Sequence, residues 1–110
     1  MGLPISLSAF AEHDLAIQYR WYLDHGGSEI AESFMENFDL TLSRLAIQPE
    51  IGKPRKFRAR ELRDMRSLAV AGNYRVQLIF YRVTEDSLSI ERVMHGARDL
   101  PRRLVELLGE

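Results

Sequence analysis

The sequence predicts an α+β fold in which an antiparallel sheet packs on a helix hairpin, in the order β-α-α-β-β-β-α. Three observations support it: helical spacing of apolar residues broken by a Gly-Gly pair, three strand-like runs in the second half, and a leucine-rich end. A chain of 110 residues has room for one hydrophobic core. We therefore expect a single domain over residues 1–110.

The first half predicts two helices. After a short strand over residues 3–7, the hydroxyl of Ser8 can cap a helix over residues 9–25. Glycines at 26–27 end that helix, and Ser28 is expected to cap the next. The second helix should bury a stripe formed by Ile30, Phe34, Phe38, Leu42 and Leu45. Joined by so short a turn, the two helices form an antiparallel hairpin.

The second half predicts an antiparallel meander of three strands. Two prolines and a glycine within residues 48–54 predict a turn that forbids regular structure. A basic connector follows this turn. Asp99 is then expected to cap a final helix over residues 100–108. The strand-like runs are 62–70, 74–82 and 88–94.

The run over residues 74–82 alternates, so that one of its faces would be fully apolar and the other mixed. Arg75 and Arg82 are seven residues apart on this run and would point to opposite faces. Both could contact a partner, or serve as edge charges that discourage strand-to-strand aggregation. The apolar face would hold Val76, Leu78 and Phe80.

Charge is unevenly distributed, although the net charge is −1. Residues 1–52 contain two arginines and eight acids, whereas residues 53–110 contain thirteen Lys or Arg and eight acids. This asymmetry predicts a basic interaction face on the sheet, or acidic helices that simply lie outside it. There is no cysteine, no signal-peptide pattern and no run of 18 apolar residues. We therefore expect a soluble cytoplasmic protein without disulfides.

Several short motifs occur in a characteristic order. They are Asp14-Leu15, Leu45-Ala-Ile-Gln-Pro-Glu-Ile-Gly-Lys-Pro54, Gly72-Asn-Tyr-Arg-Val76, Ile79-Phe-Tyr-Arg-Val83 and Val93-Met-His-Gly-Ala-Arg-Asp99. In this order and at these spacings they resemble the RelE/ParE toxin superfamily, and its ParE-like branch in particular. The resemblance implies a small bacterial toxin held inactive by a co-expressed antitoxin. RelE-like members cleave mRNA on the ribosome, whereas ParE-like members typically inhibit DNA gyrase and have no known catalytic site.

A nuclease would need a proton-transfer group and cations for the phosphate. His95 could transfer protons near neutral pH, and arginines could bind phosphate in bidentate fashion. His95 could equally be a structural residue at a strand end. No second histidine or dedicated glutamate base accompanies it, since Glu61 is the one carboxylate of the connector. A nuclease site would comprise His95, Arg63, Arg82 and Arg98.

A protein–protein interface is the other interpretation. The resemblance implies a hetero-oligomer with an acidic, ParD-like antitoxin segment, which would suit a basic rim. Trp21 falls outside the buried stripe of its helix, so it is a candidate for partner contact. His13 and His25 lack helical metal spacing, and we expect no metal site and no cofactor. The candidate residues for target or antitoxin binding are Trp21, Arg63, Arg66, Arg75, Arg82, His95 and Arg98.

Three hypotheses follow. The first is a ParE-like toxin that inhibits DNA gyrase by protein–protein contact. The second is a RelE-like, ribosome-dependent mRNA endoribonuclease. The third is a degenerate member that binds antitoxin and has lost toxicity.

Overall fold

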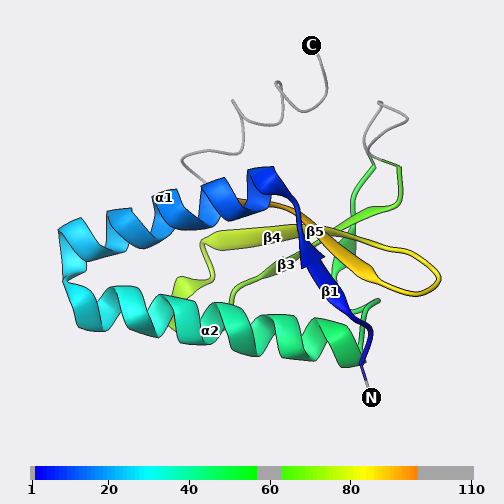
Figure 1. The fold of residues 1–110 in the computed structure, drawn as a ribbon, viewed down its shortest axis with the longest axis horizontal. Coiled ribbons are helices and arrows are strands. Elements are labelled where there is room, and N and C mark those ends of the chain that lie inside the picture. Colours follow the sequence, from blue (N-terminus) through cyan, green and yellow to red (C-terminus); the bar gives the residue numbers. More distant parts are fainter. Residues whose placement is uncertain (1, 57–62, 97–110) are drawn as a thin grey trace, which may run out of the picture.

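The computed structural model describes residues 2–56 and 63–96, which form two helices and a five-stranded sheet (Figure 1). The strands lie in the order β1-β5-β4-β3-β2. The predicted final helix, its cap Asp99 and the candidate Arg98 fall outside the described residues. The elements are β1 (Ile5–Leu7), α1 (Ala9–Gly26), α2 (Ser28–Ile47), β2 (Lys53–Pro54), β3 (Met65–Ala69), the 3-10 turn η2 (Gly72–Tyr74), β4 (Gln77–Val83) and β5 (Leu88–His95).

The helix hairpin is confirmed. The Ser8 hydroxyl accepts a hydrogen bond from the Ala11 N–H at 3.0 Å, as expected of a cap. Gly27 has φ of 87°, a conformation that favours glycine, and it alone separates the two antiparallel helices (Figure 1). The expectation that Ser28 caps α2 was wrong. Ser28 is the first helical residue and Gly27 takes the cap position, because the chain reverses within a single residue.

The core lies between the hairpin and one face of the sheet. The predicted α2 stripe is buried in its middle but not at its start, since Ile30 is 42% exposed. Burying each large apolar side chain contributes about 1.5–3 kcal/mol, which holds the helices on the sheet. The buried members are Phe34, Phe38 and Leu45 from α2, Ile79 and Tyr81 from β4, and Leu88, Ile90 and Val93 from β5.

The meander of β3, β4 and β5 is confirmed as antiparallel. β1 pairs with β5 in parallel, which makes the sheet mixed. β2 pairs with β3, with Pro54 opposite Arg66. The prediction that residues 48–54 forbid regular structure was therefore wrong at Lys53–Pro54. A short edge strand tolerates proline, because an outward-facing position needs no N–H donor.

β4 begins later than the sequence predicted. Tyr74 belongs to a 3-10 turn, where it is buried and its hydroxyl donates to the Ile30 carbonyl at 3.0 Å. Arg75 lies between this turn and the strand, so placing it on one strand with Arg82 was wrong. The mixed face of β4 packs on the helices. Its buried residues are Gln77, Ile79 and Tyr81.

Within residues 2–56 and 63–96, neither helix is apolar enough over a sufficient length to cross a membrane.

Candidate functional site

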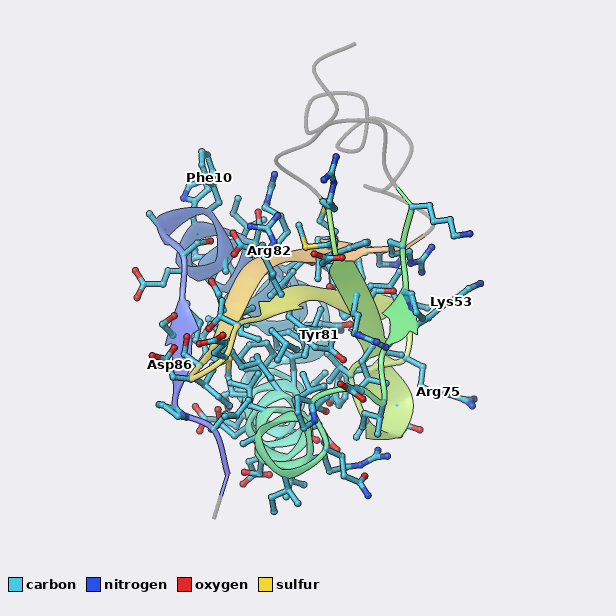
Figure 2. The ribbon with its side chains drawn as sticks, turned by 90° about the vertical axis from the view of Figure 1, so that its right-hand side faces the viewer. Phe10, Lys53, Arg75, Tyr81, Arg82 and Asp86 are labelled. Atoms are coloured by element: carbon cyan, nitrogen blue, oxygen red, sulfur yellow. The ribbon has the colours of Figure 1, made fainter. Side chains whose placement is uncertain are left out.

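A basic hollow lies where the β2 edge meets the start of β3. It has a volume of about 360 Å³ and includes two of the predicted contact residues, Arg63 and Arg66. Lys53 lies on the same edge of the sheet (Figure 2). We call this surface the basic hollow. Its lining residues are Pro54, Arg55, Lys56, Arg63, Asp64, Met65 and Arg66.

Two guanidinium groups of the basic hollow are held in place by neutral partners. Arg66 donates through Nη1 to the carbonyls of Glu50 at 3.0 Å and Gly52 at 2.8 Å. Arg55 donates through Nε to the Ser67 hydroxyl at 2.7 Å, with its guanidinium carbon 5.7 Å from the Phe80 ring centroid. No described carboxylate pairs with either arginine. Their charges are therefore oriented without being neutralised, which favours an anionic ligand.

The turn behind this hollow is fixed by Tyr81. The Tyr81 hydroxyl donates to the Pro49 carbonyl at 2.7 Å and accepts from the Gly52 N–H at 2.9 Å. Burial raises the pKa of the Tyr81 phenol. A side chain at position 52 would collide with this hydroxyl, which accounts for glycine there. The same turn supplies the carbonyls that hold Arg66, so Tyr81 positions the basic hollow indirectly.

Arg82 lies close to Arg63 but on the other side of the strand from Tyr81. In β4, successive side chains alternate between faces, and Figure 2 shows Arg82 on the side away from α2. Arg82 pairs in register with Met65, and its Nε donates to the Arg63 carbonyl at 3.3 Å. The fold therefore brings Arg63 close both to Arg66, in the basic hollow, and to Arg82. Arg66 pairs in register with Tyr81, so it lies on the opposite face of the sheet from Arg82.

His95 lies at the opposite end of the sheet. It pairs with Gln77 on β4, five residues from Arg82, which corresponds to about 16 Å along the strand. The register also puts His95 on the Gln77 face, opposite to Arg82. Arg75 is exposed at the His95 end, where the Gly96 N–H donates to the Val76 carbonyl at 2.6 Å. His95 therefore does not meet Arg63 and Arg82, and the fourth predicted nuclease residue, Arg98, lies outside the described residues.

Trp21 is 40% exposed on the outer side of α1. Its indole stacks on the His25 ring, with centroids 4.2 Å apart and an interplanar angle of 16°. The neighbouring Tyr22 points inward, where its ring lies 4.9 Å from that of Phe34. The expectation that Trp21 lies outside the buried stripe of its helix thus agrees with the structure, although partner contact by Trp21 stays a prediction.

A buried ion pair that the sequence did not indicate joins α1 to β5. Arg92 donates to both carboxylate oxygens of Asp14, through Nε at 2.7 Å and Nη2 at 2.9 Å. The same carboxylate accepts the Val93 N–H at 3.0 Å, beyond the point where β1 ends. Asp14 therefore supplies the acceptor that a longer β1 would have supplied. The sequence signal for this pair was that Asp14 lies three residues after Ala11, on the buried face of the helix.

Metal ligation has no support in the described segments. Across residues 2–56 and 63–96, no three His, Asp or Glu side chains come together as a possible ligand set.

Comparison with known proteins assigns the family. Residues 5–100 match the family model described as ParE toxin of type II toxin–antitoxin system, parDE. The chain belongs to the ParE toxin family. A solved structure titled "Chromosomal ParDE TA system from P. aeruginosa" is similar, with 18% identity and a TM-score of 0.67. The match covers 84% of this chain and 95% of that one, so the fold is shared. No curated protein matches.

Membership confirms the resemblance read from the motifs, and with it the α+β fold. A ParE toxin of a type II system implies an antitoxin partner. In this chain the oriented guanidinium groups of Arg55 and Arg66 lie near the β2 edge, and His95 lies at the opposite end of the sheet.

Proposed function

We propose that this ParE-family toxin inhibits DNA gyrase by protein–protein contact in the bacterial cytoplasm, and that its antitoxin neutralises it by binding. The observation that carries the proposal is the separation of His95 from Arg82 by the length and the thickness of the sheet. General acid–base catalysis needs the proton-transfer group within hydrogen-bond reach of the reacting atoms. Arg82, about 16 Å away along the strand and on the other face, cannot hold the same phosphate for His95.

The basic hollow supports an acidic antitoxin segment as the neutralising partner. Arg55 and Arg66 are already oriented, so binding costs less side-chain entropy than ordering free arginines would. Arg63 and Lys56 are exposed and have no carboxylate partner among the described residues. Such a surface favours a carboxylate-rich segment and speeds its association.

The decisive assay compares two targets with one purified toxin. Supercoiling of relaxed plasmid by DNA gyrase should fall as the full chain is added, whereas cell-free translation should continue and transcripts should stay intact. Cleaved transcripts with unaffected gyrase would overturn the proposal in favour of the endoribonuclease. A chain that affects neither, yet binds antitoxin, would be a non-toxic member.

A charge-reversal pair tests the antitoxin half of the proposal. Lys56→Glu combined with Arg63→Glu should lower affinity for the antitoxin by about tenfold or more at low salt, mainly through the association rate. Arg20→Glu is the matched control, because Arg20 is exposed on α1 and pairs there with Asp24. Equal affinity of both variants would remove the basic hollow from the antitoxin interface. Binding can be measured by titration calorimetry at two salt concentrations.

A further inference from the structure

The basic hollow offers hydrogen-bond donors that no described residue uses. Arg66 donates through Nη1 to both the Glu50 and the Gly52 carbonyl, which leaves its Nε and Nη2 hydrogens for a ligand. Arg55 has the reverse arrangement, since its Nε donates to Ser67 and its two terminal nitrogens are left. Each guanidinium therefore presents one complete edge of its fork, the geometry that holds a phosphate in bidentate fashion.

The two guanidinium groups belong to opposite faces of the sheet. Arg66 is opposite Pro54, whereas the Arg55 N–H donates to the Met65 carbonyl one residue further along the chain. Neighbouring positions of a strand alternate between faces. The arrangement therefore suits a ligand with two or more anionic groups better than a single small anion.

Further cations extend this set along the same edge. Lys56 and Arg63 line the basic hollow and are exposed, and Lys53 lies on the β2 edge two residues before Arg55 (Figure 2). Two residues of a strand span about 6.4–6.8 Å, which is comparable with the spacing of successive phosphates along a nucleic-acid backbone. The described lining contains one acid, Asp64, against four Lys or Arg. A polyanion therefore meets a row of cations here.

The basic hollow has no surface on which bases could stack. None of its described lining residues is aromatic, and the Phe80 ring beneath Arg55 is only 1% exposed. Proteins that hold single strands combine cations with exposed aromatic side chains on which bases stack. Cations without such rings contact the phosphates of a duplex and do not read its bases.

Charge on the helix hairpin orients such a ligand. The two helices carry seven acids and two arginines over residues 9–47. The hairpin therefore repels a polyanion while the β2 edge attracts it, and the approach of a duplex is directed to one edge of the sheet.

We propose that the basic hollow binds the phosphate backbone of double-stranded DNA without sequence preference, so that the toxin contacts the DNA that gyrase holds as well as gyrase itself. This inference rests on the proposed inhibition of gyrase and adds a second ligand to the basic hollow. The acidic antitoxin segment proposed for the same cations would compete with DNA for them.

Fluorescence anisotropy with a labelled duplex of about 20 base pairs tests the contact, using the full chain without antitoxin. Affinity in the micromolar range is expected at low salt, and two duplexes of unrelated sequence should bind within about twofold of each other. A plot of log affinity against log salt concentration should have a slope of about −3.6, because each of about four phosphate contacts contributes about −0.9.

A matched pair of double variants assigns the contact to the basic hollow. Lys56→Ala with Arg63→Ala should change the slope to about −1.8 and weaken binding by about tenfold or more at low salt. Arg20→Ala with Arg44→Ala removes the same charge from exposed helix positions and should leave the slope at about −3.6. Equal slopes for the two double variants would overturn the assignment to the basic hollow.

A competition experiment tests whether carboxylates and DNA share these cations. Poly-L-glutamate stands in for the carboxylate-rich segment and should displace the duplex from the wild type. A duplex that stays bound would overturn the shared site. Tighter binding of a single-stranded RNA than of the duplex would overturn the assignment to DNA.

The supercoiling assay separates this inference from the proposed function. Absence of DNA binding by a toxin that still inhibits supercoiling overturns the DNA contact and leaves the proposed function standing. DNA binding with the expected slope by a toxin that leaves gyrase unaffected supports the contact and overturns the proposed function.

Discussion

The two edges of the sheet are built in opposite ways. β2 is two residues long and consists of Lys53 and Pro54, whereas β1 is an uncharged Ile-Ser-Leu. The Arg55 N–H donates to the Met65 carbonyl, so positions 53 and 55 face β3 and position 54 faces outward. Proline at that outward position has no N–H to offer another strand. Proline therefore closes the outward position of β2 to strand addition, whereas the three residues of β1 include neither a proline nor a charge.

The neighbourhoods of the edges differ in the same sense. The β2 edge adjoins the basic hollow, whereas the β1 edge adjoins a mainly apolar hollow of about 510 Å³ that Leu7 lines together with residues of α1. One edge therefore presents cations, and the other presents mostly apolar side chains.

The largest expected loss of stability comes from breaking the ion pair between Asp14 and Arg92, on the β1 side of the sheet. Asp14→Ala leaves Arg92 buried without its carboxylate and Val93 N–H without its acceptor. Removing one partner of such a pair costs about 3–5 kcal/mol. Urea denaturation should show the loss as a lower midpoint. A change below about 1 kcal/mol would mean that Asp14 does not hold α1 on the sheet.

A smaller loss of stability is expected on the β2 side of the sheet, where Tyr81 fixes the turn before β2. Tyr81→Phe removes the hydroxyl that serves Pro49 and Gly52, and leaving these groups unsatisfied costs about 1–3 kcal/mol. Exchange of the Gly52 amide should accelerate, while that of Val93 on the other side should change only through global stability. Unchanged exchange at Gly52 would contradict the role given to Tyr81.

Alkaline pH should remove the stability that the protonated Tyr81 hydroxyl contributes on the β2 side of the sheet. The pKa of Tyr81 is raised in the folded chain above its ordinary value of 10.0, because burial disfavours the phenolate. The folded state then holds this proton longer than the unfolded state, so the contribution is complete below pH 10.0 and lost as the pH rises through the raised pKa. Urea midpoints measured from about pH 9 upward should fall more steeply for the wild type than for Tyr81→Phe. Parallel curves would contradict the assignment.

The smallest expected change in stability comes from replacing Lys53 and Pro54, the two residues of the β2 edge. Lys53→Val combined with Pro54→Val should cost less than about 1 kcal/mol, because both residues are exposed at an edge. It should nevertheless produce self-association, since the edge would gain an outward N–H and lose a charge. Light scattering against protein concentration measures this, with Ser6→Lys on β1 as the variant that should remain monomeric. A monomeric double variant would show that β2 needs no such protection.

Sequence periodicity predicted the helix hairpin and the meander because apolar spacing reports which faces are buried. It failed where a single residue or a distant contact decided the structure. Ser28 was displaced from its cap by the one-residue turn at Gly27, and Arg75 was excluded from β4 by the 3-10 turn of Tyr74. The pairing of Asp14 with Arg92 spans 78 residues, a separation on which local pattern carries no information.

The candidate site was predicted in part. Arg63 lies in the basic hollow with Arg66 and also contacts Arg82, but Arg66 and Arg82 lie on opposite faces of the sheet. Their separation from His95 could not be read from the sequence, because it depends on the register of β4 against β5. Arg55 was not singled out, since its fixed position results from contacts with Ser67 and Phe80 on other strands.

The central claim is that this toxin acts by contact and not by histidine-dependent cleavage. The most direct test expresses the wild type and His95→Ala at equal levels without antitoxin, and measures growth, plasmid supercoiling and transcript integrity. We predict equal growth arrest, equal loss of supercoiling and intact transcripts. Loss of toxicity in a folded His95→Ala variant, together with transcript cleavage by the wild type, would contradict the account.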